Sequence, residues 1–101
     1  SMINKINKYS FRQAFIDMGR QNQFSYDGIN NLLEYFEEYE DSTGEQIELD
    51  VIAICCDFTE YEDLKEFHNE YSKEEYPNID TLMDYTQVIE NNDGSFIIQA
   101  F

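Results

Sequence analysis

The sequence predicts a small α+β domain in which about four helices pack on a three-stranded sheet, in the order ααβααββ. Two helical patterns come first, the most apolar stretch spans Ile47 to Phe58, and two β-rich runs lie on either side of a turn-forming segment near the end. The 101 residues are the length of one domain. We therefore assign residues 10–101 to a single α+β domain and residues 1–9 to a basic N-terminal arm.

The first helix is expected from about residue 11 to residue 19. Ser10 and Gln13 have the spacing of a capping box, in which both side chains satisfy free backbone groups at a helix start. Gly19 is a suitable end. The helical repeat places four apolar side chains on one face: Phe11, Ala14, Phe15 and Met18.

The second helix is expected to begin after Ser25 and to run to about Asp41, before Gly44 ends it. At about 100° per residue, one side is apolar and another carries carboxylates. Glu40 falls over the apolar side, so either the helix frays there or this side chain turns out to solvent. The carboxylate side forms a first acidic stripe of Glu34, Glu37, Glu38 and Asp41.

The run from Val51 to Cys56 is predicted to be a short strand that is covered on both faces. It is rich in β-branched residues and shows no alternation of apolar and polar side chains. Because successive strand residues point to opposite faces, a disulfide between Cys55 and Cys56 is not expected. Both cysteines are interpreted as small buried apolar residues.

A third long helix is expected from about residue 60 to residue 71, with Thr59 and Glu62 as its capping box. His68 falls on its predicted buried face, where a packed, hydrogen-bonded role is the simplest interpretation. The opposite face forms a second acidic stripe of Glu62, Asp63, Glu66 and Glu70. Tyr76-Pro77 ends this helical region.

The last part of the chain predicts a short helix capped by Asp80 and then a β-hairpin. Residues 86–90 and 96–101 are the two β-rich runs, and the segment Asn91 to Ser95 between them has strong turn chemistry. Residues 96–98 are apolar on both faces, so we expect a sheltered strand next to the central one.

Charge is the strongest global signal, with 6 basic and 22 acidic residues and a net charge of −16. Residues 21–101 contain 21 of the acids and only two lysines. The resulting field favours basic partners and opposes direct binding to nucleic acid or to anionic membranes. Acidity that only keeps the protein soluble is the alternative interpretation.

No pattern in the sequence predicts an enzyme, a metal site or a cofactor. The chain has one histidine, no zinc-ligand spacing and no phosphate-binding glycine loop. Asn91 to Gly94 resembles the start of a calcium loop, but an EF-hand needs a glutamate where this chain has Ala100, so the segment is interpreted as a turn. Signal peptides, lipidation motifs and long apolar runs are missing from the sequence, and we expect a cytoplasmic protein.

The two acidic stripes are the candidate partner-binding surface, with Tyr35 and Tyr39 among them. Carboxylates three and four residues apart are about 4.5–6 Å apart along a helix axis, which coarsely imitates a row of phosphates. Tyrosine adds contact area at low entropic cost in interfaces. The alternative interpretation is that these tyrosines are half-buried at the edge of the core. Three further acids are candidate extensions of the surface: Asp57, Glu60 and Asp80.

The segment ELDVIAICCDFTEY, residues 48–61, resembles a family of small acidic proteins of bacteriophages and related mobile elements. The segments FRQAFIDMGRQNQFSYDGINNLLEYFEEYE and SFIIQAF are also similar, so the resemblance spans most of residues 10–101. The family has no established activity, and the resemblance therefore implies no catalytic residues. It implies a phage context, in which several unrelated acidic proteins that counter host defences mimic nucleic acids.

Charge and resemblance together predict a non-enzymatic phage-type inhibitor or host-takeover protein. It would present a DNA-like acidic surface to a basic nucleic-acid-binding protein of the bacterial host, in the manner of anti-restriction or anti-CRISPR proteins. The alternative is a small acidic adaptor or regulator that binds one protein through aromatic or sheet-edge contacts. A second copy of the chain, in a homodimer, is also among the candidate partners.

Overall fold

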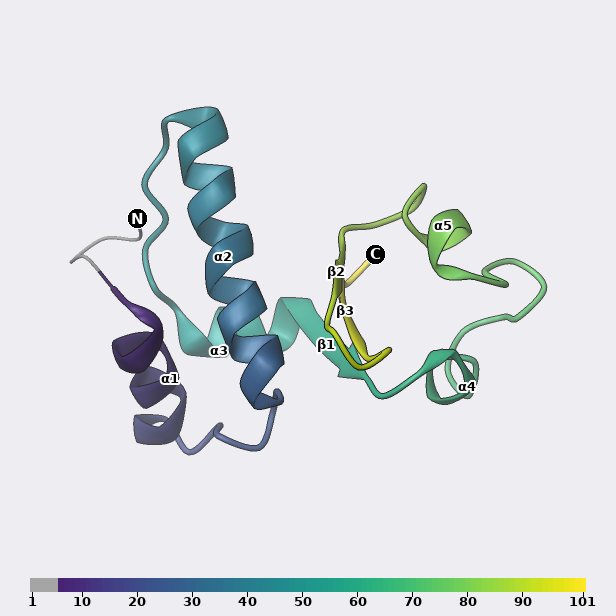
Figure 1. Cartoon of the computed structure of the whole chain (residues 1–101), viewed down its shortest axis with the longest axis horizontal. Coiled ribbons are helices and arrows are strands. Elements are labelled where there is room, and N and C mark those ends of the chain that lie inside the picture. The colour runs from purple at the N-terminus through teal and green to yellow at the C-terminus, as the bar shows by residue number, and fades with distance from the viewer. Residues whose placement is uncertain (1–5) are drawn as a thin grey trace.

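The computed structural model describes residues 6–101 as one α+β domain in which a three-stranded antiparallel sheet stands between two groups of helices (Figure 1). This confirms the predicted fold class. The elements follow the order α1 (Lys8–Asp17), α2 (Tyr26–Thr43), α3 (Val51–Asp57), β1 (Phe58–Tyr61), α4 (Leu64–Phe67), α5 (Ile79–Leu82), β2 (Val88–Glu90) and β3 (Phe96–Gln99).

The last strand in sequence, β3, is the central strand of the sheet. The order is β1-β3-β2, and both pairs are antiparallel, with Tyr61 opposite Phe96 and Val88 opposite Ile98. Both faces of β3 are covered, since Phe96, Ile97 and Ile98 are all buried. The prediction of a sheltered strand at residues 96–98 is therefore confirmed, although its neighbour is not the segment that the sequence suggested.

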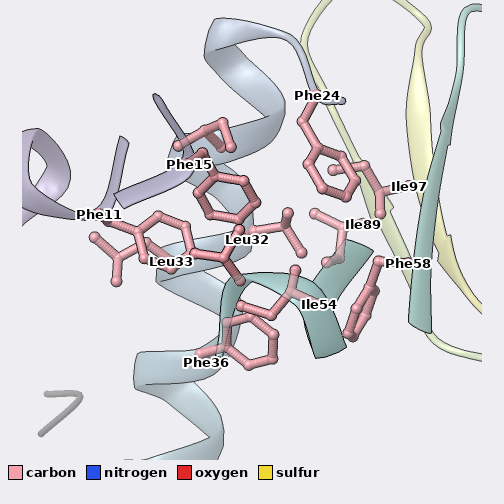
Figure 2. Close-up of a cluster of buried hydrophobic side chains, with 12 residues drawn as sticks. Phe11, Phe15, Phe24, Leu32, Leu33, Phe36, Ile54, Phe58, Ile89 and Ile97 are labelled. Atoms are coloured by element: carbon pink, nitrogen blue, oxygen red, sulfur yellow. The ribbon is translucent and has the colours of Figure 1, made fainter. Parts of the chain in front are cut away.

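One face of the sheet packs against α1, α2 and α3. Figure 2 shows Phe11 and Phe15 from α1 meeting Leu32, Leu33 and Phe36 from α2, with side chains of α3 and the sheet closing the cluster. Alternation along the strands places Phe58, Ile89 and Ile97 on this face. This first core is the larger of the two hydrophobic clusters.

The other face of the sheet carries a second, aromatic cluster. Tyr61, Phe67 and Phe96 are buried there in mutual ring contact, and α5 contributes the fully buried Leu82. Figure 1 accordingly shows α4 and α5 on the side of the sheet opposite α2. The strands thus join two cores that share no helix.

A polar network also connects the sheet to the start of α2. The carboxylate of Glu60 on β1 accepts hydrogen bonds from the backbone nitrogen and hydroxyl of Ser25 and from Nδ2 of Asn91. Asn91 is buried, and its Oδ1 accepts a hydrogen bond from Asn31 of α2. Helix α2, β1 and the hairpin are therefore held at one polar junction.

The helices α1 and α2 largely match the prediction. Ser25 caps α2 by accepting a hydrogen bond from the Gly28 nitrogen, and Gly44 ends the helix with a φ of 73°. The capping box predicted for α1 is wrong. Asn7 is the N-cap, and Ser10 is its partner in the capping box, not the cap itself. Met18, expected on the buried face, is exposed because α1 ends at Asp17.

The predicted basic arm at residues 1–9 also needs correction. Ile6 packs against the first core, Asn7 caps α1, and the next two residues lie in α1, so these four residues belong to the domain. Residues 1–5 lie outside the part of the chain that the structure describes.

The strand predicted for residues 51–56 is wrong, because this segment is the helix α3. Asp50 caps it by accepting a hydrogen bond from the Ala53 nitrogen, and Val51 and Ile54 share its buried side. A short apolar run fits a buried strand or a buried helix equally well, so its pattern alone did not distinguish the two. The helix leaves Cys55 half-buried and Cys56 exposed, both as free thiols, which corrects their assignment as buried residues.

The long helix predicted for residues 60–71 is also wrong. Residues 58–61 pair with β3 as β1, and only Leu64–Phe67 form a helix. Asp63 is its N-cap and accepts a hydrogen bond from the Glu66 nitrogen, so this cap acts in place of the predicted Thr59 cap. Pairing with the central strand outweighs the local helical pattern here.

The remaining elements were predicted with small errors. The hairpin of β2 and β3 is confirmed, with Gly94 of the turn at a φ of 89°. The short helix α5 is present, but its N-cap is Asn78 and not Asp80.

Candidate partner-binding surface

The first predicted acidic stripe lies along the outer side of α2. Glu34, Glu38 and Asp41 are exposed and Glu37 is half-buried, while Leu32, Leu33 and Phe36 on the opposite side fill the first core. The helical repeat separates these two sides, as the sequence indicated. The structure therefore presents this stripe as one continuous acidic face.

A hollow of about 460 Å³ opens beside this face, which we call the α2 groove. Tyr35 and Tyr39 of α2 form one wall, and residues of α3 and of the sheet end form the other. Three carboxylates line it: Glu48, Asp50 and Asp57. Tyr39 is 44% exposed, so its ring is available to a partner while it lines the groove.

A second, smaller hollow of about 230 Å³ lies on the other side of Tyr35. Glu34 and Glu38 from α2 and Glu90 from β2 line it. Tyr35 belongs to both hollows, so the two form one surface around the helix. Neither lining contains a lysine, arginine or histidine from residues 6–101. Six carboxylates thus flank two tyrosines: Glu34, Glu38, Glu48, Asp50, Asp57 and Glu90.

Tyr35 is anchored from beneath. Its ring makes edge contacts with the buried rings of Phe36 and Phe58, with centroids 5.4 and 6.0 Å away. Burial and, to a smaller degree, the neighbouring Tyr39 raise the pKa of its hydroxyl, so Tyr35 is a neutral hydrogen-bonding group near neutral pH. The expectation that these tyrosines sit at the edge of the core describes Tyr35 better than Tyr39.

Glu40 fixes the far wall of the groove. Its side chain is 5% exposed, and its Oε2 accepts a 2.7 Å hydrogen bond from the backbone nitrogen of Ile47. The expectation that Glu40 frays or turns to solvent is therefore wrong. The carboxylate instead holds the returning segment against α2, so that Glu48 and Asp50 reach the groove.

The second predicted stripe does not form a helical face. Asp63 and Glu66 cap the short α4, where a Glu66 oxygen also accepts a hydrogen bond from the Glu62 nitrogen. Glu70 accepts a hydrogen bond from the hydroxyl of Tyr61. Glu62 contributes its backbone nitrogen, and not its carboxylate, to these contacts. The candidate partner-binding surface therefore centres on α2.

The three acids predicted to extend the acidic surface lie in different parts of the domain. Asp57 lines the α2 groove. Glu60 faces inward to Ser25 and Asn91, and Asp80 lies in the first turn of α5 in the other half of the domain. Sequence reasoning missed Glu48, Asp50 and Glu90, because none of them belongs to a helical stripe and only the fold brings them to α2.

Other candidate chemistry is accounted for by packing. The Nε2 of His68 lies 2.6 Å from the carbonyl oxygen of Tyr76, which confirms a packed, hydrogen-bonded histidine. In residues 6–101 no group of three or more His, Cys, Asp or Glu side chains is arranged to hold a metal ion. None of the helices described is both long and apolar enough to cross a membrane.

Comparisons with protein-family models, curated proteins and solved structures find no match to this chain. The resemblance of residues 48–61 to a bacteriophage family therefore stays a prediction. Any function is inferred from the geometry and the charge of the surface itself.

Proposed function

We propose that this protein is a non-enzymatic inhibitor that binds a basic, nucleic-acid-binding protein through the α2 groove and its acidic flanks. The partner we expect is a defence protein of a bacterial host, as in anti-restriction or anti-CRISPR inhibition. One observation carries the proposal: six carboxylates flank Tyr35 and Tyr39, and within residues 6–101 no basic side chain lines either hollow.

The energetic balance supports a cationic partner. Like charges three and four residues apart on α2 destabilise the helix by a few tenths of a kcal/mol per pair. Solvated helices usually relieve this repulsion with lysine or arginine, which are not found beside the stripe on α2. A partner that supplies the missing cations gains long-range attraction and a fast encounter.

The spacing supports mimicry of a phosphate backbone. Glu34, Glu38 and Asp41 follow the helix at intervals of about 4.5–6 Å, and duplex DNA carries a charge every 3.4 Å or so along each strand. Glu48 and Asp57 add charges on the opposite side of the groove. A protein surface shaped for a nucleic-acid backbone would therefore meet charges on two sides of a cleft.

A competition assay tests the proposal. Purified restriction enzymes and CRISPR effector proteins, each holding labelled duplex DNA, are titrated with this protein, and DNA release is measured. We expect release by at least one of them, with an affinity that falls steeply between about 50 and about 200 mM salt. An affinity that is constant over this range contradicts mimicry.

Matched charge-reversal variants locate the surface. The triple change Glu34→Lys, Glu38→Lys and Glu48→Lys should weaken binding on the order of tenfold or more, since it places like charges against the partner. The control Asp17→Lys, Asp27→Lys and Glu62→Lys alters the net charge equally at exposed acids that line neither hollow. Equal losses in the two variants would show that total charge matters and the groove does not.

The exposure of Tyr39 favours a second candidate, an adaptor that binds one protein mainly through aromatic contacts. In that case Tyr39→Ala weakens binding strongly, whereas the groove charge reversal is tolerated. For the inhibitor proposed here the order of the two effects is reversed. Comparing both variants with one partner therefore separates the two functions.

A further inference from the structure

A set of aromatic side chains on the far side of the sheet forms a continuous surface, which we call the aromatic platform. It consists of Tyr71, Tyr76, Tyr85 and Phe101. Phe101 stacks on Tyr71 at 5.5 Å, and Tyr76 makes perpendicular contacts with Tyr85 at 5.0 Å and with Phe101 at 5.5 Å. Tyr71 also stacks on the buried Phe67, so the platform rests on the second core.

The outer part of the platform is open to solvent. Tyr85 is 56% exposed and Phe101 is 49% exposed, and the neighbouring Met83 is also exposed. Two large rings held in contact with each other and still exposed are unusual for a surface that only faces water. Tyrosine and phenylalanine in such clusters are the residues that protein interfaces favour.

The platform adjoins the α2 groove. Gln87 and Gln99 line the groove at the sheet end. Tyr85 lies two residues before Gln87, and Phe101 lies two residues after Gln99. The segments are fastened together there, because the Thr86 hydroxyl donates to the Gln99 carbonyl at 2.6 Å. Asp57 of the groove accepts a 2.7 Å backbone bond from Ala100, next to Phe101. One partner can therefore reach both surfaces.

Acidic side chains accompany the platform. Glu75 precedes Tyr76 and Asp84 precedes Tyr85, and both acids are exposed. Partial burial and then the Glu75 carboxylate raise the pKa of the Tyr76 hydroxyl. Lys65 and Lys73 line a separate hollow with His68 and Pro77. Aromatic faces bordered by carboxylates suit a planar cation.

We propose that the aromatic platform is a docking surface for arginine side chains of the basic partner whose neighbouring segment lies in the α2 groove. The inference rests on the proposed function and specifies the chemistry of the partner. A guanidinium is planar and weakly hydrated and stacks on aromatic rings, whereas the lysine ammonium is a compact, strongly hydrated charge. The platform therefore selects arginine over lysine. The groove carboxylates, in contrast, attract both residue types by charge.

Oligo-arginine and oligo-lysine peptides of equal length provide the test. We measure their affinities for the full chain by calorimetry and expect oligo-arginine to bind more tightly by about two- to fivefold for each ring contact. Arginine also pairs well with carboxylates, so the preference of the native protein alone does not locate its source. The decisive variant is Tyr85→Leu with Phe101→Leu, which keeps apolar area but removes both exposed aromatic faces.

This double variant should lose the part of the arginine preference that stacking supplies, while its affinity for oligo-lysine stays unchanged. Tyr85→Phe should keep the preference, and so should Tyr9→Leu, which removes a ring that is 77% exposed on α1. An undiminished preference in the double variant overturns the proposal, as does the lack of any preference in the native protein. Circular dichroism checks that each variant is folded.

Failure of this inference is distinguishable from failure of the proposed function. If the platform is not used but the groove is, the groove charge reversal weakens both peptides and the double leucine variant weakens neither. If neither peptide binds in a salt-dependent way, the proposed function itself fails. A second copy of this chain is the other possible occupant of the platform, and sedimentation of the native and double leucine proteins tests it. A native dimer that the leucine substitutions dissociate would assign the platform to a second copy and overturn the arginine proposal.

Discussion

The carboxylate of Glu60 lies 2.6 Å from the backbone nitrogen of Ser25 and 2.7 Å from its hydroxyl, although the two residues are 35 positions apart. Ser25 is the N-cap of α2, and its hydroxyl oxygen also accepts a hydrogen bond from the Gly28 nitrogen. A strand carboxylate thus sits at the positive end of the longest helix in residues 6–101, where negative charge is favourable. This contact orients the helix that carries the candidate binding surface.

Replacing Glu60 with glutamine should lower the free energy of unfolding by about 1–3 kcal/mol. The amide group of glutamine cannot accept at both positions, so donors of Ser25 or Asn91 lose their partner. Urea unfolding measures the effect. The control Glu90→Gln removes an exposed carboxylate and should change stability by less than about 0.5 kcal/mol. Equal effects in the two variants would contradict the structural role of Glu60.

Gly28→Ala should destabilise the protein, although alanine is ordinarily the better helix former by about 1 kcal/mol. A methyl group at this buried position would overlap the Glu60 carboxylate and press on the Ser25 hydroxyl. The same substitution should be neutral or stabilising when Glu60 is already alanine. Urea unfolding of the four proteins in this double-mutant cycle measures the coupling. If Gly28→Ala has the same effect with and without the Glu60 side chain, the predicted clash with Glu60 is wrong.

Glu40→Ala should lower the free energy of unfolding by about 1–3 kcal/mol, because the buried carboxylate binds the Ile47 nitrogen. It should also speed amide exchange at Ile47 and loosen the groove wall that carries Glu48. Hydrogen exchange followed by NMR measures both. Glu38→Ala, on the exposed side of the same helix, serves as the control and should leave exchange at Ile47 unchanged.

The two adjacent cysteines should react with alkylating reagents at different rates. Cys56 is exposed, whereas burial raises the pKa of the half-buried Cys55 thiol and outweighs the smaller, opposite influence of Arg20. Since the thiolate is the reactive form, labelling of Cys55 should need a higher pH. Mass spectrometry of Cys55→Ser and Cys56→Ser proteins measures each rate. Faster labelling of Cys55 would place the thiols differently from the structure.

Asp93 in the hairpin turn should titrate below the ordinary aspartate pKa of 3.8. Its carboxylate accepts hydrogen bonds from the Ser95 hydroxyl and, at 3.0 Å, from the Ser95 nitrogen, and these stabilise the charged form. The stabilisation is complete above the unfolded-state pKa and is lost as the pH falls through the lowered folded-state pKa. NMR titration of the carboxyl carbon measures the midpoint, and Ser95→Ala should move it upward.

Local signals were sufficient for the elements whose pattern is long or chemically specific. Ser25 and Gly44 enclose an 18-residue amphipathic helix, and the turn from Asn91 to Ser95 defines the hairpin. These features depend on neighbours in sequence, so the sequence predicts them well. The first acidic stripe follows from the same periodicity, and three of its four acids are exposed as expected.

The segment from Val51 to Tyr61 shows where local reasoning failed. Its apolar run suits a strand, yet the Asp50 cap and the first core make it a helix, and the strand begins only at Phe58. The capping pattern at Thr59 predicted a helix start, but residues 58–61 instead pair as β1 with β3, about 40 residues further along the chain. The Asp50 cap is a local signal that the apolar pattern obscured, whereas the pairing of β1 with β3 joins distant residues that no short window of sequence contains.

By itself the sequence determined the fold class, the span of α2, the terminal hairpin and the large negative charge, since each is set by composition or by short-range chemistry. Only the tertiary structure decided that the second stripe disperses into caps and hydrogen bonds, and that Glu60 turns inward to Ser25. The same packing brought Glu48, Asp57 and Glu90 to α2, because the surface at one helix depends on which distant segments the core holds against it.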